Sequence, residues 1–224
     1  MKNNIIAMVK SRQLFFVCFL LLLLAAGISI PLFGNNYYPA HPFWLNVFFI
    51  NYTFMGDGIF AIVIGLLCIF YFNRKNDGMS ILASFLFTQL LIQLAKNLFA
   101  GTQPGIFFEA GQTFLNKEIA GSSPALISGH TAMAFAIATV LILHSKKVLW
   151  QMALLAAAVL LGYSRIYLAQ HSLSDVLIGS VLGTLSGLVA VYIVYAKTNS
   201  FAKLRNIFKV RYKDPLPAST IQTV

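Results

Sequence analysis

Charged residues are scarce in this chain. They make up 10% of its 224 residues, whereas soluble domains contain about 25%. Acidic residues are the rarest, with six Asp and Glu beside 16 Lys and Arg. Hydrophobic residues account for 58%, and the mean hydropathy is +0.78. This balance excludes both a disordered chain and an ordinary soluble enzyme, and it indicates a protein with several membrane spans.

Cysteine is also sparse. The only two, Cys18 and Cys68, lie inside apolar runs of the sequence. Such positions predict buried thiols and argue against a disulfide or a cysteine-based metal site. Carboxylates and histidines do not occur at a spacing typical of metal ligands, so we expect neither a metal nor another cofactor.

Six apolar runs have the length, or nearly the length, at which a helix crosses about 30 Å of hydrocarbon. They cover residues 14–33, 58–72, 79–100, 131–143, 148–168 and 176–196. The predicted fold is therefore all-α, a bundle of six transmembrane helices. Residues 1–13 precede the transmembrane domain at 14–196, and a basic tail follows at 197–224. The first run resembles a signal peptide in its flanking cations, but its length favours a membrane helix.

Lys and Arg residues are distributed unevenly over the two sides of this bundle. Thirteen of the 16 fall on the side of the termini, in 1–13, 74–75, 146–147 and 197–213. The positive-inside rule then predicts that both termini are cytoplasmic. We expect the basic tail to lie on anionic lipid headgroups. This accounts for the net charge of +10 without a nucleic-acid partner.

Polar residues gather at the opposite, outer ends of the last four spans. They occur in three segments, at 96–104 after the third span, at 127–130 before the fourth, and at 164–175 between the fifth and sixth. The predicted topology places all three segments on one side of the membrane at similar depth. We therefore expect them to form one site.

The residue types in these segments favour an anion. Ser128 is a good N-cap for the fourth span, and Gly129 allows a ligand to approach the backbone. A helix N-terminus attracts negative charge. Lys96 adds a point charge, and Arg165 can bind phosphate through two parallel hydrogen bonds. So many donors suit a phosphate better than a carboxylate.

Two histidines flank this predicted phosphate site. Asp175 follows His171 by four residues, so in a helical segment it can hold one ring nitrogen and leave the other to attack phosphorus. A protonated His130 is then the candidate general acid for the leaving oxygen. The two histidines need opposite protonation states, which their surroundings must provide.

Structural roles compete with this interpretation. Ser172 and Asp175 have the spacing of a capping box. Lys96 and Arg165 lie at span ends, where long cationic side chains extend to the interface. His130 lies near a helix start, where it can support a cap.

Other polar or small residues are assigned no catalytic role. Gly179, Gly183 and Gly187 share one helical face with Asp175, which predicts close helix packing. His41 and His144 are expected to be uninvolved. Three acids on the outer side also have no assigned role, namely Asp57, Glu109 and Glu118.

The pattern resembles the type 2 phosphatidic acid phosphatase (PAP2) superfamily. Its three motifs are Lys-x6-Arg-Pro, Pro-Ser-Gly-His and Ser-Arg-x5-His-x3-Asp. The third is matched in full by Ser164, Arg165, His171 and Asp175. The second is matched by Ser128, Gly129 and His130, with Ile127 in place of proline. The first is matched by Lys96 and Pro104, with Gln103 in place of arginine.

The resemblance implies a metal-independent reaction in two steps. His171 would attack the terminal phosphorus and form a phosphohistidine, held in orientation by Asp175. His130 would protonate the leaving group and later activate water. The phosphate oxygens would be held by Lys96, Gln103, Ser128, Gly129 and Arg165.

The resemblance also implies a substrate class and a location. The expected substrate is a lipid phosphate or diphosphate of the undecaprenyl diphosphate, phosphatidylglycerol phosphate or phosphatidic acid type. No obligate protein partner is expected beyond the membrane lipids. The expected location is a bacterial inner membrane, with the site facing the periplasm or exterior.

Alternatives remain open at this point. They are a lipid A phosphatase or phosphotransferase of the same family, a catalytically silent lipid-binding relative, and a small transporter. Gln103 is uncharged, and charge-assisted hydrogen bonds are about twice as strong as neutral ones. Its presence predicts an altered specificity, or an acceptor other than water.

Overall fold

The regular elements of this computed structural model are all helices within residues 12–33, 42–99, 127–168 and 170–213, the ranges that it describes. Side chains at 27–33, 96, 99 and 197–213 are outside this description. The helices are α2 (Gln13–Phe33), α3 (Phe43–Thr53), the short 3-10 helix η1 (Phe54–Gly56), α4 (Gly58–Phe70), α5 (Lys75–Phe99), α6 (Gly129–His144), α7 (Val148–Tyr167) and α8 (Leu173–Lys213). The predicted all-α class is confirmed.

Each predicted span coincides with a helix, but their number as membrane crossings stays a prediction. In the described part of the chain, length and composition suffice for a crossing in three helices, which are α5, α7 and the first part of α8. A fourth crossing results if α3 with η1 and α4, which meet at a bend of 58°, form one broken span. The apolar parts of α2 and α6 are shorter.

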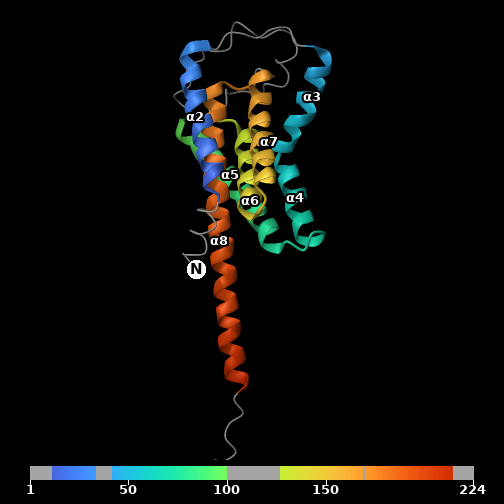
Figure 1. Cartoon of the computed structure of the whole chain (residues 1–224), viewed down its shortest axis with the longest axis vertical. Coiled ribbons are helices and arrows are strands. Elements are labelled where there is room, and N and C mark those ends of the chain that lie inside the picture. Colours follow the sequence, from blue (N-terminus) through green and yellow to red (C-terminus); the bar gives the residue numbers. More distant parts are fainter. Residues whose placement is uncertain (1–11, 34–41, 100–126, 169, 214–224) are drawn as a thin grey trace, which may run out of the picture.

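Two features of the helices were not predicted. The sequence analysis placed no element over 43–53, where α3 lies. It also assigned no helix to the basic tail from 197 on, where α8 continues to Lys213 and extends beyond the other helices (Figure 1). The boundary of the transmembrane domain at 196 stays a prediction.

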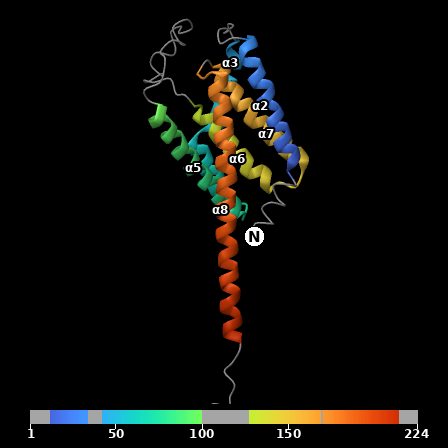
Figure 2. The same cartoon turned by 90° about the vertical axis from the view of Figure 1, so that its left-hand side faces the viewer.

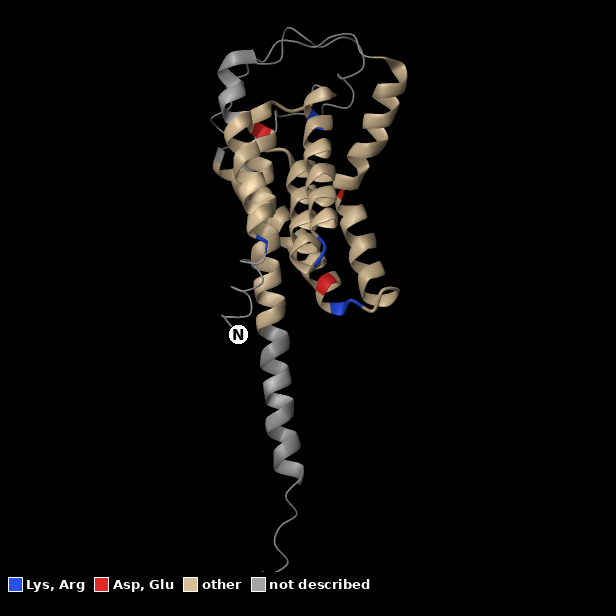
Figure 3. Ribbon diagram, in the orientation of Figure 1, with Lys and Arg blue, Asp and Glu red and all other residues tan. Residues whose placement is uncertain are grey.

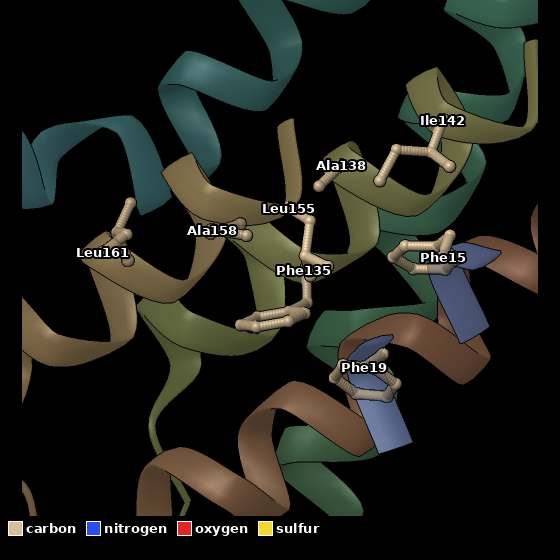
Figure 4. Packing of buried hydrophobic residues seen from close by; sticks show 9 residues of the cluster. Phe15, Phe19, Phe135, Ala138, Ile142, Leu155, Ala158 and Leu161 are labelled. Atoms are coloured by element: carbon tan, nitrogen blue, oxygen red, sulfur yellow. The ribbon is translucent and has the colours of Figure 1, made fainter. Parts of the chain in front are cut away.

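Helix α6 forms the centre of the bundle (Figures 1 and 2). Every residue from 131 to 140 is buried, as expected for a helix that is apolar on all sides. On one side α6 packs against α2 and α7, where the ring centroids of Phe19 and Phe135 lie 5.4 Å apart (Figure 4). On the other side a second apolar cluster joins α6 to α4, α5 and α8.

Glycines allow α8 to approach the α6 backbone closely. A Cβ atom at Gly183 would overlap the carbonyl oxygen of Ala132, and one at Gly179 would lie 2.7 Å from that of Ser128. Backbone atoms cannot rotate away as a side chain can. The predicted packing role of this glycine face is confirmed, and it brings the start of α8 against the start of α6.

A Gly183→Ala variant is expected to be less stable, because the added methyl group forces α6 and α8 apart. Overpacking of this kind costs about 1–3 kcal/mol, occasionally more. The thermal unfolding midpoint of the purified protein in detergent measures the loss. Leu185→Ala is the control, since Leu185 lies on the same helix with 49% of its surface exposed. An unchanged midpoint for Gly183→Ala would mean that the helices are not in contact there.

A charged cluster ties the bundle together at the end where α5 begins and α6 ends. Asp77, in the first turn of α5, is buried and forms an ion pair with Arg74. Its other oxygen lies 3.2 Å from Nε2 of His144, and the His144 ring lies 5.3 Å from that of Tyr195 on α8. Lys and Arg in the described ranges also lie mainly toward this end, which is the lower one in Figure 3. His144 thus has a structural contact that its sequence position did not predict.

Candidate active site

The structure brings two of the three predicted segments together at the starts of α6 and α8 and the end of α7. The backbone N–H of Ser128 donates to the carbonyl oxygen of Asp175, with a distance of 3.2 Å. His130, in the first turn of α6, interacts electrostatically with both Arg165 and His171. We call the following residues the candidate site: Ser128, Gly129, His130, Arg165, His171 and Asp175. Of the remaining segment, the Lys96 side chain and Gln103 lie outside the described residues.

Ser128 is the N-cap of α6, as its sequence position predicted. Its Oγ accepts a hydrogen bond from the backbone N–H of Thr131 at 3.4 Å, and the two hydroxyl oxygens are 2.8 Å apart. Ser128 is fully buried. Among the described residues outside its own helix turn, a Cβ atom at Gly129 would meet Cδ1 of Ile92 at 3.6 Å, which is an ordinary contact. The described residues therefore do not crowd the first turn of α6 at Gly129, and the N–H groups of a first turn have no partner within the helix.

Arg165 is a buried cation in the last turn of α7. The residue is 8% exposed, and its Nη1 donates to Oγ1 of Thr53 at 2.8 Å. Its Nε is buried without a hydrogen-bond partner among the residues described. In the same ranges no carboxylate lies within 4.0 Å of it. Since burying an uncompensated charge is costly, this arrangement fits a cation that receives an anionic ligand.

His171 and Asp175 lie together at the start of α8. His171 Nδ1 is 3.6 Å from Asp175 Oδ2, which also accepts a hydrogen bond from the backbone N–H of Ser172 at 3.0 Å. The Ser172 hydroxyl accepts from the Asp175 N–H at 3.3 Å, which completes a capping box. The capping role and the contact with His171 therefore coexist in one carboxylate. Because Nδ1 faces Asp175, Nε2 is the ring nitrogen that is left for chemistry.

Sequence reasoning missed the contribution of the break between α3 and α4. Besides Thr53, this break carries Asp57, whose Oδ1 accepts from the N–H of Ile59 at 3.2 Å and whose charge acts on His130. Asp57 is the N-cap of α4. An Asp-Gly pair before an apolar run is an N-cap signal, so it was available to locate this break. Nothing local in the sequence points to Thr53.

The arrangement suits transfer of a phosphoryl group. Two imidazoles and a buried guanidinium gather beside a helix N-terminus. Phosphoryl transfer depends mostly on positioning and on stabilisation of negative charge, and groups of these types can supply both.

Comparison with known proteins agrees with this chemistry. The family model of the PAP2 superfamily matches residues 77–199 of this chain. The undecaprenyl-diphosphatase of Sulfolobus acidocaldarius is 31% identical over 147 residues, which are 66% of this chain and 68% of that protein. The bacitracin transport permease protein BcrC of Bacillus licheniformis is 32% identical over 134 residues, 58% of this chain and 63% of that protein. The crystal structure of Aquifex aeolicus LpxE is similar with a TM-score of 0.54 and 28% identity, covering 68% of this chain and 88% of that one.

Proposed function

Because the chain belongs to the PAP2 superfamily, we propose that it is an integral membrane phosphatase that releases phosphate from a lipid phosphomonoester or diphosphate. The observation that carries the proposal is the position of His171, whose ring lies 3.6 Å from Asp175 and whose backbone N–H donates to the carbonyl oxygen of the buried Arg165. An oriented nucleophile and a cation for the phosphate oxygens are the minimum that this reaction needs.

The proposed reaction has two steps. His171 Nε2 bonds to the terminal phosphorus while the bond from that phosphorus to the leaving oxygen breaks, and His130 gives that oxygen a proton. The leaving oxygen is the lipid oxygen in a phosphomonoester and the bridging oxygen of the lipid monophosphate in a diphosphate. His130 then takes a proton from water, whose oxygen bonds to phosphorus as the bond to His171 breaks. Arg165 and the first-turn N–H groups of α6 stabilise the charge on the phosphate oxygens in both steps. Lys96, Gln103 and Ser128 are proposed to contribute further hydrogen bonds.

The substrate proposed first is a polyprenyl diphosphate. The support is the similarity to a protein named undecaprenyl-diphosphatase over about two thirds of both chains. The proposed membrane arrangement has six crossings, with the α3–α4 pair as one of them, and with the candidate site on the outer side of an inner membrane. The distribution of Lys and Arg supports this orientation.

A substrate panel tests the proposal. The protein is purified in detergent with a chelator and incubated with undecaprenyl diphosphate, phosphatidylglycerol phosphate and phosphatidic acid, and the released phosphate is measured. We expect release without added metal, fastest from undecaprenyl diphosphate. Release that requires a divalent metal would overturn the mechanism, and the absence of release from all three lipids would overturn the function.

A further inference from the structure

The break between α3 and α4 forms a wall of the candidate site. A Cβ atom at Gly56, in η1, would lie 2.6 Å from the carbonyl oxygen of His130. The chain therefore passes directly against the first turn of α6 at this point. The break also carries two polar side chains, Thr53 at the end of α3 and Asp57 at the start of α4.

Thr53 holds a group of the site that is far away in the sequence. Its Oγ1 accepts the 2.8 Å hydrogen bond from Arg165 Nη1, across 112 residues of chain. The helix that carries Thr53 is fixed on α7 by its own contacts. The Tyr52 hydroxyl donates to the carbonyl oxygen of Ala157 at 2.9 Å, and the Phe49 ring lies 4.5 Å from that of Tyr167. The acceptor is thus held in place before any ligand binds.

The chemistry of this partner matters, because a hydroxyl is neutral. A carboxylate in its place would orient the guanidinium equally well but would cancel the positive charge that a phosphate needs. The Thr53 hydroxyl accepts from Nη1 of the guanidinium. The opposite edge of the guanidinium is formed by Nε and Nη2. Nε is buried and has no partner within the described ranges. That edge has the fork geometry that binds two oxygens of one phosphate.

We propose that Thr53 is a positioning residue, which fixes the Arg165 guanidinium so that its Nε–Nη2 edge binds the phosphate group of the substrate. The inference rests on the proposed function for its reaction, but it is stated for phosphate binding as such. It assigns the α3–α4 break a part in the site that none of the three PAP2 motifs contains.

The test compares Thr53→Val, which removes the hydroxyl at constant shape, with Thr53→Ser, which keeps it. Thr139→Val is the matched control, because Thr139 Oγ1 is a buried hydroxyl of α6 without a hydrogen-bond partner in the described structure. Two quantities are measured for each variant. They are KM and kcat for the lipid with the fastest phosphate release, and the affinity for orthovanadate from the thermal stabilisation that it produces.

The expected result is a loss of affinity with Thr53→Val alone. KM and the orthovanadate dissociation constant rise by roughly 10-fold or more, which is the size expected for one hydrogen bond to a charged group. Thr53→Ser and Thr139→Val stay within about twofold of the wild type, below the effect of one such bond. Thr53→Ala serves in place of Thr53→Val if the valine variant does not fold.

The outcomes separate this inference from the proposed function. If Thr53→Val unfolds at a lower temperature but keeps its KM and its orthovanadate affinity, Thr53 is a packing residue and the inference is overturned. If the wild type binds orthovanadate but releases no phosphate, the proposed function fails, and the orthovanadate affinities of the variants still decide the inference. If the wild type does neither, both are overturned.

Discussion

Replacing His171 by alanine is expected to abolish phosphate release, with kcat lowered by about 10⁴-fold or more, as for other covalent nucleophiles. The reason is that the first step forms a bond between nitrogen and phosphorus. A water molecule in the variant is not held in a fixed position as the histidine ring is, so it attacks phosphorus far more slowly. Arg165 and the α6 N-terminus remain in this variant, so substrate binding should persist. Initial rates of phosphate release, measured with KM, separate the two effects.

The covalent intermediate gives a second measurement of the same prediction. A phosphohistidine is labile in acid and stable in alkali, so radiolabelled substrate should leave an alkali-stable label on the wild type and none on His171→Ala. The matched control is His144→Ala, a histidine near Asp77 rather than in the candidate site. That variant should lose stability but keep kcat in its folded fraction. Retained turnover or retained label in His171→Ala would remove His171 as the nucleophile.

The helices were predictable where hydropathy alone decides the structure. The run at 148–168 matches α7 (Val148–Tyr167) almost to the residue, because an apolar segment in lipid must satisfy its backbone internally and does so as a helix. Helix α3 escaped prediction for a related reason. Its eleven residues are too few for a membrane crossing, and they include Asn46 and Asn51. A prediction that searches for apolar runs of membrane-spanning length therefore does not find this helix.

In the candidate site, contacts between residues close in the sequence were predictable, and contacts between distant segments were not. The spacing of His171 and Asp175 predicted their approach, since residues four apart meet on a helix or at its start. The contact between Thr53 and Arg165 had no local signal, because it depends on how α3 packs against α7. The capping box at Ser172 was foreseen as a competing explanation for Asp175, and the structure contains both contacts. Only a substitution separates their contributions.

Asp175→Asn makes that separation. The amide oxygen still accepts the hydrogen bond from the Ser172 N–H, so the start of α8 keeps its cap. The negative charge beside His171 Nδ1 is lost, and with it the preference for the tautomer that leaves Nε2 free to attack. We expect kcat to fall on the order of 10³-fold or more, as for aspartates that orient a catalytic histidine. The thermal unfolding midpoint should stay close to that of the wild type.

Ser172→Ala is the complementary variant, because it removes the hydroxyl that accepts from the Asp175 N–H and leaves the carboxylate in place. Losing this half of the capping box should cost about 1 kcal/mol of stability, with kcat nearly unchanged. Asp175→Ala should combine both losses. If Asp175→Asn instead retains wild-type kcat, while Asp175→Ala and Ser172→Ala are destabilised alike, the carboxylate serves only the helix, and His171 would need another partner to fix its ring.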